Sequence, residues 1–157
     1  MADIPERTLA TMDLTKTVPR SVKDTSLEGI VMLARTTDKA RAHAAGTVGE
    51  YHYNCGMDQK VLAFVGVDHV EFEELAARND DVKLTSILRE RFLKKSAAEI
   101  AGFNADYLKL SPEPGSDSEK YFLDLRRSVA PDRTDVSTWP DLLDLDEGRQ
   151  VARLRAA

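Results

Sequence analysis

His52, Cys55 and Asp58 are the residues whose types and spacing could do chemistry, because each follows the last by three positions. All three residue types ligate transition metals, and a histidine can act as the base that activates a thiol. Strong zinc sites combine two such clusters, however, and this chain has only one cysteine, so we predict no metal and no other cofactor. In the simpler interpretation, Cys55 packs as a small apolar side chain and Asp58 caps a helix.

Asp38 and Arg41 lie three residues apart in a segment with helical periodicity, so their side chains come within reach of each other. Arg41 also falls in the apolar stripe of that helix, and a charge buried there must be paired. One interpretation is a structural ion pair that ties the helix to the core. The other is a ligand site, in which Arg41 is presented to a small anionic ligand and Asp38 orients it.

Tyr51 and Tyr53 follow two glycines, Gly46 and Gly49, and this arrangement also has two interpretations. The tyrosines can line a pocket whose glycines let the backbone approach a ligand. They can equally cover the core with their hydroxyls hydrogen-bonded. The Gly-x-x-Gly spacing is not a phosphate-binding loop, because no strand precedes it and no Lys-Ser or Lys-Thr pair ends it.

The elements that position these residues follow from the hydrophobic periodicity. The clearest is a helix over residues 27–45, whose apolar face comprises Ile30, Leu33, Ala34, Thr37, Ala40 and Ala44. Its opposite face carries Glu28, Arg35, Lys39 and His43. Gly46 follows where the end of a helix favours a residue with positive φ. Residues 47–55 alternate as one short extended segment would, but no second clear strand exists to pair with it.

Further helices have start signals or apolar faces of their own. They are expected over residues 58–65, 81–94 and 97–109. Helix starts are also indicated by three pairs with capping-box spacing: Asp68/Glu71, Ser96/Glu99 (which precedes the helix over residues 97–109) and Ser116/Glu119. A short turn near Trp139 and a last helix from about Asp146 complete the pattern. We therefore predict a mainly α fold: a single compact domain of six to eight short helices over residues 19–157. An irregular N-terminal arm over residues 1–18 precedes it, and at most one short extended segment occurs near residues 47–55.

Composition narrows the function classes. The 157 residues carry a net charge of −5, a sign that disfavours a general nucleic-acid binder. A single cysteine excludes an internal disulfide, which fits a reducing cytoplasm. The first twenty residues contain no apolar signal-peptide core, and the longest apolar run, Val61–Val67, is far shorter than a membrane span. The sequence thus predicts a soluble, cytoplasmic protein with no membrane partner.

The sequence from Leu33 to Asp68, LARTTDKARAHAAGTVGEYHYNCGMDQKVLAFVGVD, and the tail LLDLDEGR resemble a bacterial family of unknown function, DUF5069. Pro19-Arg20-Ser21, the run Asp38–Arg41 and the turn Gly46–Tyr51 match the pattern of that family, whereas Ala34 stands where the family usually has a proline. The resemblance covers nearly the full chain. It implies that the domain begins at about Pro19 and draws attention to residues 38–58, but it implies no reaction.

Two function hypotheses remain. The first is a non-enzymatic module that binds a small ligand or a protein partner through residues 38–58, and it allows a symmetric homodimer. The second is a small enzyme that uses Cys55 with His52, or Arg41, in a pocket lined by Tyr51 and Tyr53. An enzyme should gather these residues around one concave site.

Overall fold

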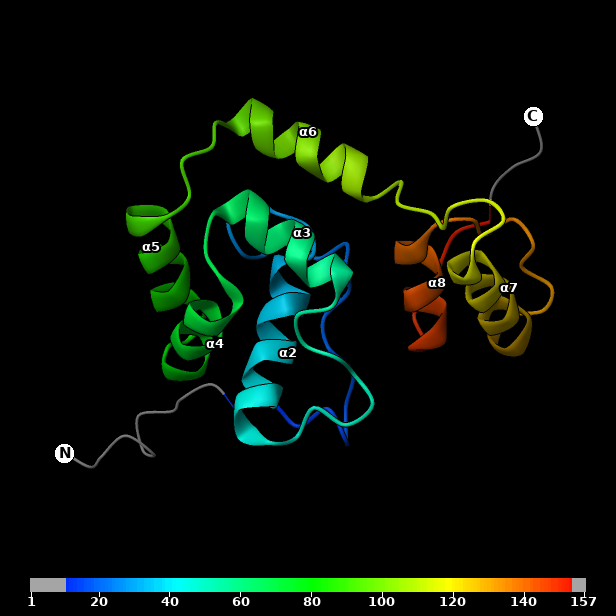
Figure 1. The fold of residues 1–157 in the computed structure, drawn as a ribbon, viewed down its shortest axis with the longest axis horizontal. Coiled ribbons are helices and arrows are strands. Elements are labelled where there is room, and N and C mark those ends of the chain that lie inside the picture. Colours follow the sequence, from blue (N-terminus) through cyan, green and yellow to red (C-terminus); the bar gives the residue numbers. More distant parts are fainter. Residues whose placement is uncertain (1–10, 154–157) are drawn as a thin grey trace.

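The computed structural model describes residues 11–153, and within this range the chain forms seven α-helices and no β-strand (Figure 1). The helices are α2 (Leu33–Ala45), α3 (Gly56–Val65), α4 (His69–Arg78), α5 (Asp81–Arg91), α6 (Ala97–Tyr107), α7 (Asp117–Val129) and α8 (Trp139–Asp146). The predicted mainly α, single-domain fold is confirmed. The segment expected to be extended, residues 47–55, consists of turns and irregular loop.

Helix α2 is the centre of the molecule, and every residue from Leu33 to Ala42 is buried. It packs against α3 and α4, with α5 beyond α4 (Figure 1). The prediction placed its start at residue 27, which is wrong. Residues 27–32 form turns, because the backbone takes positive φ at Glu28, Gly29 and Met32 and therefore cannot continue a right-handed helix. The end of α2 is as predicted, with Gly46 in the left-handed conformation.

The turn that precedes α2 is held by α6. Asn104 accepts a hydrogen bond from the amide of Val31 at 3.0 Å and donates one to the carbonyl of Gly29 at 2.8 Å. The ring of Phe103 stacks on that of Phe64 with centroids 4.1 Å apart. Helix α6 thereby lies across α3 and the loop before α2 (Figure 1).

The predicted capping residues start three helices. Asp68, Ser96 and Ser116 accept hydrogen bonds from the first-turn amides of α4, α6 and α7. Helix α5 begins at Asp81 as predicted, directly after its cap Asp80, but it ends at Arg91 rather than at residue 94. The last helix ends at Asp146, where we expected one to begin. A further helix is not formed over the described residues after 146, because Gly148 has φ 84° and the amide of Arg149 turns back to the Asp144 carbonyl at 2.8 Å.

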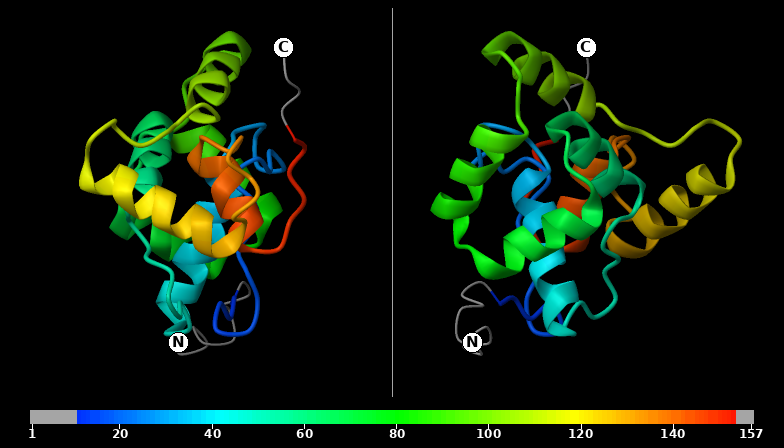
Figure 2. Two further views of the ribbon diagram at one scale, coloured as in Figure 1. Left: turned by 90° about the vertical axis from the view of Figure 1, so that its right-hand side faces the viewer. Right: turned by 60° about the vertical axis from the view of Figure 1, so that its left-hand side comes forward.

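Apolar side chains form two separate clusters. The larger cluster draws on helices α2 to α6 and on the loop before α2. The smaller one consists of Phe122, Val136 and Leu142, with partly buried neighbours from α7 and α8. Helix α7 lies at the edge of the molecule beyond α8 and is reached from α6 by a long loop (Figure 2).

Of the predicted N-terminal arm, residues 1–10 lie outside the described part of the chain. The rest is irregular, as predicted, and packs through Leu14, whose amide donates to the carbonyl of Thr47 at 2.9 Å. Gly49 permits this contact, because a Cβ at its position would lie 3.1 Å from the carbonyl oxygen of Leu14 while φ is 62°. This glycine brings the backbone close to another segment of the chain itself.

Candidate functional site

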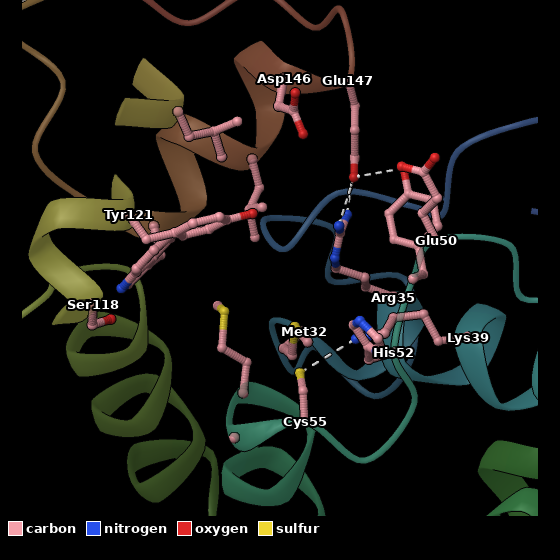
Figure 3. A pocket seen from close by; sticks show the side chains of 16 residues that line it. Met32, Arg35, Lys39, Glu50, His52, Cys55, Ser118, Tyr121, Asp146 and Glu147 are labelled. Atoms are coloured by element: carbon pink, nitrogen blue, oxygen red, sulfur yellow. Dashed lines mark hydrogen bonds and ion pairs between the residues drawn. The ribbon is translucent and has the colours of Figure 1, made fainter. Parts of the chain in front are cut away.

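A pocket of about 590 Å³ lies between α2, the loop and first turn of α3, and helices α7 and α8 (Figure 3). Its volume is within the range of roughly 300–1,000 Å³ that is usual for small-molecule sites. The pocket occupies the space between the two apolar clusters, so its walls come from segments more than a hundred residues apart in the sequence.

One wall of the pocket is largely apolar. Helices α7 and α8 contribute Tyr121, Leu125, Trp139 and Leu143, and α3 contributes Met57. The rings of Tyr121 and Trp139 are roughly parallel, with centroids 6.3 Å apart, and Trp139 also makes an edge contact with Phe122 at 4.9 Å. This aromatic pair offers a flat face of the kind that binds rings or cations.

The opposite wall contains a polar cluster built around Asp58. Its carboxylate is fully buried and accepts hydrogen bonds from Lys39 Nζ at 2.9 Å and from Thr36 Oγ1 at 2.7 Å. The amides of Asn54 and Cys55 also donate to it, so Cys55 takes the N-cap position of α3 and forms a capping box with Asp58. Lys39 Nζ lies 3.4 Å from Cys55 Sγ.

Arg35 and Glu147 form the second polar cluster of the pocket. Two guanidinium nitrogens of Arg35 donate to the two carboxylate oxygens of Glu147 at 2.9 and 2.6 Å, and both side chains are almost completely buried. The hydroxyl of Tyr51 donates a hydrogen bond to the same carboxylate at 3.0 Å. Burial would raise the pKa of Glu147, but the hydrogen bonds and charge of Arg35 outweigh it and hold that pKa below its usual value. Burial and the Glu147 charge raise the pKa of Tyr51 to about 12.

The structure separates the six residues predicted as ligand-binding candidates into two groups. Tyr51, His52 and Cys55 line the pocket. Tyr53 does not; its hydroxyl donates to the carbonyl of His69 at 2.7 Å, and its ring lies beside those of His43 and His69. Asp38 and Arg41 also lie elsewhere, in a network that joins α2 to α5.

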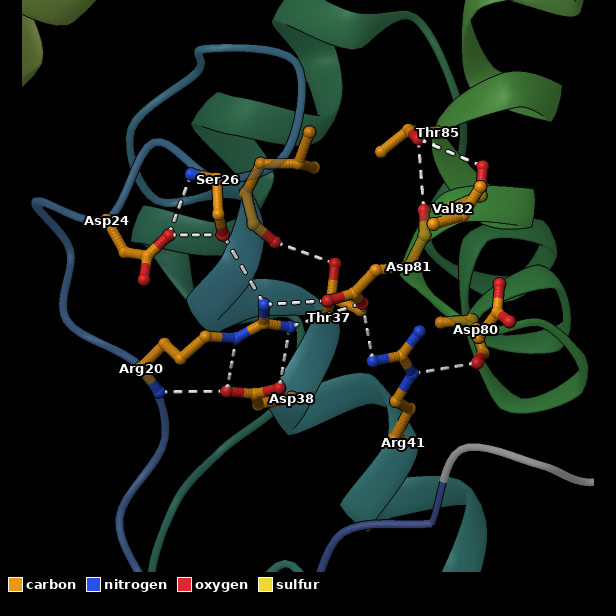
Figure 4. A network of polar contacts seen from close by, with 12 residues as sticks. Arg20, Asp24, Ser26, Thr37, Asp38, Arg41, Asp80, Asp81, Val82 and Thr85 are labelled. Carbon is orange, nitrogen blue, oxygen red and sulfur yellow. Dashed lines mark hydrogen bonds and ion pairs between the residues drawn. The ribbon is translucent and has the colours of Figure 1, made fainter.

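Asp38 and Arg41 do not pair with each other (Figure 4). Asp38 is bound by Arg20, through the Arg20 amide at 2.8 Å and through Nε and Nη2 at 3.1 and 3.0 Å. Arg41 binds Asp81 at 2.9 Å, and Arg20 contacts the same Asp81 carboxylate at 2.9 Å. Their spacing on the helix made a direct pair possible, but each side chain finds a better-placed partner on another segment.

Arg41→Ala is expected to lower the free energy of unfolding by about 2 kcal/mol, because three of its hydrogen bonds are lost. Arg41 donates to the carbonyls of Ala76 and Asn79 as well as to Asp81, and so fastens α2 to the junction of α4 and α5. Urea denaturation measures the loss, with the exposed Arg127→Ala as a control that should change little. Unchanged stability in Arg41→Ala would mean that the network carries no structural role.

His52, Cys55 and Asp58 do not converge on one point. Asp58 faces into the protein toward Lys39 and Thr36, whereas His52 is exposed at the pocket rim. Over residues 11–153 no three His, Cys, Asp or Glu side chains are arranged to hold a metal ion. The spacing of these residues reflects a helix start, in which Asp58 occupies the third helical position rather than the cap itself.

Sequence reasoning missed several pocket residues, chiefly Arg35, Lys39, Trp139 and Glu147. Periodicity placed Arg35 and Lys39 on the polar face of their helix, and nothing in a single helix indicates that α8 covers that face. Only the tail LLDLDEGR, part of the family resemblance, pointed toward Glu147.

The fold and the pocket together define a small all-α protein with a mixed polar and apolar cavity. Residues 16–149 match the family described as a domain of unknown function, DUF5069, and the chain belongs to that family. No curated protein is significantly similar to the chain. None of the described helices combines the length and apolar character required to cross a lipid bilayer.

Proposed function

We propose that this protein is a non-enzymatic binding module whose pocket takes a small amphipathic molecule. The observation that carries the proposal is the division of the pocket into two walls. One presents Tyr121, Leu125 and Trp139 to an apolar body, and the other carries polar side chains, among them Glu50, His52 and Asp146. Such a combination of apolar surface and a few fixed polar groups is typical of small-molecule sites.

Binding is favoured over catalysis because the polar groups already hold one another. Lys39 is engaged by Asp58, and Arg35 is engaged by Glu147. A catalytic cysteine usually has a base within hydrogen-bond reach, oriented by a third group. Among the described residues His52 makes no hydrogen bond, either to Cys55 or to a residue that would orient it.

A second candidate function is thiol-dependent acyl transfer at Cys55. The contact between Lys39 Nζ and Cys55 Sγ, 3.4 Å long and on the pocket wall, favours it. p-Nitrophenyl acetate distinguishes the two functions. An enzyme should turn it over repeatedly and lose that turnover in Cys55→Ser, whereas in a binding module Cys55 should be acetylated no more than once.

The pocket has a unique reporter on each wall, because the chain contains one tryptophan and one cysteine and both line the cavity. We expect 3-phenylpropan-1-ol, a neutral aromatic probe, to change Trp139 fluorescence and to slow the labelling of Cys55 by iodoacetamide. Both signals should follow one saturation curve. A probe that reaches millimolar concentration without changing either reporter would contradict the proposal.

Tyr121→Ala provides the matched variant. Tyr121 is 62% exposed, so its loss should leave the fold intact while removing half of the aromatic face. We expect the affinity for the neutral probe to fall about tenfold, in line with the stacking contribution of one ring. Val70→Ala, at a position 61% exposed and outside the pocket, should leave the affinity unchanged.

A further inference from the structure

We propose that the ligand of this pocket is an organic cation, an ammonium group carried on an apolar or aromatic body. This inference rests on the proposed function and adds the chemical class of the ligand. It comes from the distribution of charge around the cavity, where the buried positive side chains are each paired with a carboxylate and further carboxylates have no paired cation within the described part of the chain.

The two buried cations of the pocket are each matched by a carboxylate. Arg35 is bound through two nitrogens to both oxygens of Glu147, and Lys39 is bound to Asp58 at 2.9 Å. An anionic ligand would have to compete with these carboxylates for donors that are already used. It would also be desolvated close to them, which is unfavourable.

Asp146 and Glu50 also line the pocket, and neither side-chain carboxylate forms a hydrogen bond or ion pair with any residue in the range 11–153. Desolvation, followed by the charge of neighbouring Glu147, raises the pKa of Asp146 above its usual value, although the charge of Arg35 acts in the opposite direction. A ligand ammonium would supply a compensating positive charge. Glu50 adds a second negative charge at the rim.

Trp139 and Asp146 are the first and last residues of α8 and both line the cavity, so the aromatic pair and the Asp146 carboxylate lie toward opposite ends of that helix. Figure 3 shows Asp146 beside Glu147 at one edge of the cavity and Tyr121 at another. The faces of tryptophan and tyrosine attract cations, and a carboxylate adds a Coulombic attraction of its own. Asp146, Tyr121 and Trp139 therefore combine the two features by which proteins recognise an alkylammonium or arylalkylammonium ion.

Three probes of equal size test the inference: 3-phenylpropylammonium, 3-phenylpropan-1-ol and 3-phenylpropionate, titrated at low ionic strength with Trp139 fluorescence as the readout. We expect the cation to bind about tenfold more tightly than the alcohol, and the anion more weakly than either. Protection of Cys55 from iodoacetamide by the same probes shows that binding occurs in this cavity.

Asp146→Asn is the decisive variant, because it removes the charge and keeps the shape at an exposed position. It should reduce the preference for the cation over the alcohol several-fold and leave the affinity for the alcohol unchanged. Asp124→Asn, on an exposed turn of α7 outside the pocket, should alter neither.

Each remaining outcome has one meaning. If the alcohol binds and the cation binds no more tightly, or if the anion binds best, the cation inference is overturned while the proposed function stands. Unchanged cation preference in Asp146→Asn also overturns the inference. If no probe binds, the proposed function itself fails.

Discussion

Replacing Asp58 with alanine is expected to lower the free energy of unfolding by about 3–5 kcal/mol, because the substitution leaves a buried ammonium without its partner. The carboxylate of Asp58 is fully buried and is the hydrogen-bond acceptor for four groups: Thr36 Oγ1, Lys39 Nζ and the amides of Asn54 and Cys55. Its loss also frees the first turn of α3. Urea denaturation with circular dichroism measures the change.

The control for Asp58→Ala is Asp68→Ala, which removes an exposed cap from α4 and should lower the free energy of unfolding by about 1 kcal/mol. Lys39→Met combined with Asp58→Ala should recover part of the loss, since no unpaired charge remains. Asp58→Asn serves as a milder variant if the alanine protein does not fold. An Asp58→Ala protein as stable as Asp68→Ala would refute the central role given to this carboxylate.

Arg35→Met is expected to lower the free energy of unfolding by about 3 kcal/mol. The substitution keeps the length of the side chain but removes the two bonds to Glu147 and the bond to the carbonyl of Arg20. It also removes the cation that stands 5.7 Å from the ring of Tyr51. Because these contacts join α2 to α8, the pocket should lose its shape together with its stability.

The pH dependence of Arg35→Met provides a further readout. The folded protein holds the pKa of Glu147 below its ordinary value of 4.5, so the stability from Glu147 is present above pH 4.5 and is lost as the pH falls through the folded value. In Arg35→Met this acid loss should be smaller, because Arg149 is then the main remaining cationic partner of the carboxylate. An equal loss of stability at acid pH in both proteins would mean that groups other than the Arg35–Glu147 pair cause the pH dependence.

The positions of the helices could be predicted where local signals decide them. Ser96 and Glu99 form the expected capping box, and Gly46 ends α2 as expected, because the hydrogen bonds involved join residues a few positions apart. The start of α2 could not be predicted. Residues 27–32 have helical periodicity, but Asn104, 73 residues beyond Val31, holds their backbone in turns.

The burial of α2 is the largest departure from the sequence-based expectation. A helix with charges on one side is ordinarily exposed there, and the periodicity places Arg35 and Lys39 on that polar side. In the protein both are buried, because Glu147 and Asp58 arrive from other segments to pair with them. The identity of such partners depends on how the chain folds back on itself, which a single sequence does not reveal.

The candidate site could be predicted only in part for the same reason. Tyr51, His52 and Cys55 were found because they lie in one short segment with unusual composition. The opposite wall comes from α7 and α8, and Tyr121 and Trp139 read as ordinary residues of amphipathic helices. Asp38 and Arg41 are charged residues of α2 that are buried, as the sequence indicates. Their hydrogen bonds hold α2 against the segment before it and against α4 and α5 instead of lining the pocket.

The division of the apolar side chains into two clusters sets the order in which the molecule opens. The smaller cluster, around Phe122 and Leu142, buries few side chains, and α8 is attached to the rest of the molecule through charged groups such as Glu147 and through the partly buried Leu143. Helices α7 and α8 should therefore unfold locally at a lower free energy than the rest, and their amide hydrogens should exchange with solvent first. The pocket exists only while these helices are docked. Ligand binding in the pocket and the protection of these amides from exchange therefore both depend on the same docking equilibrium of α7 and α8.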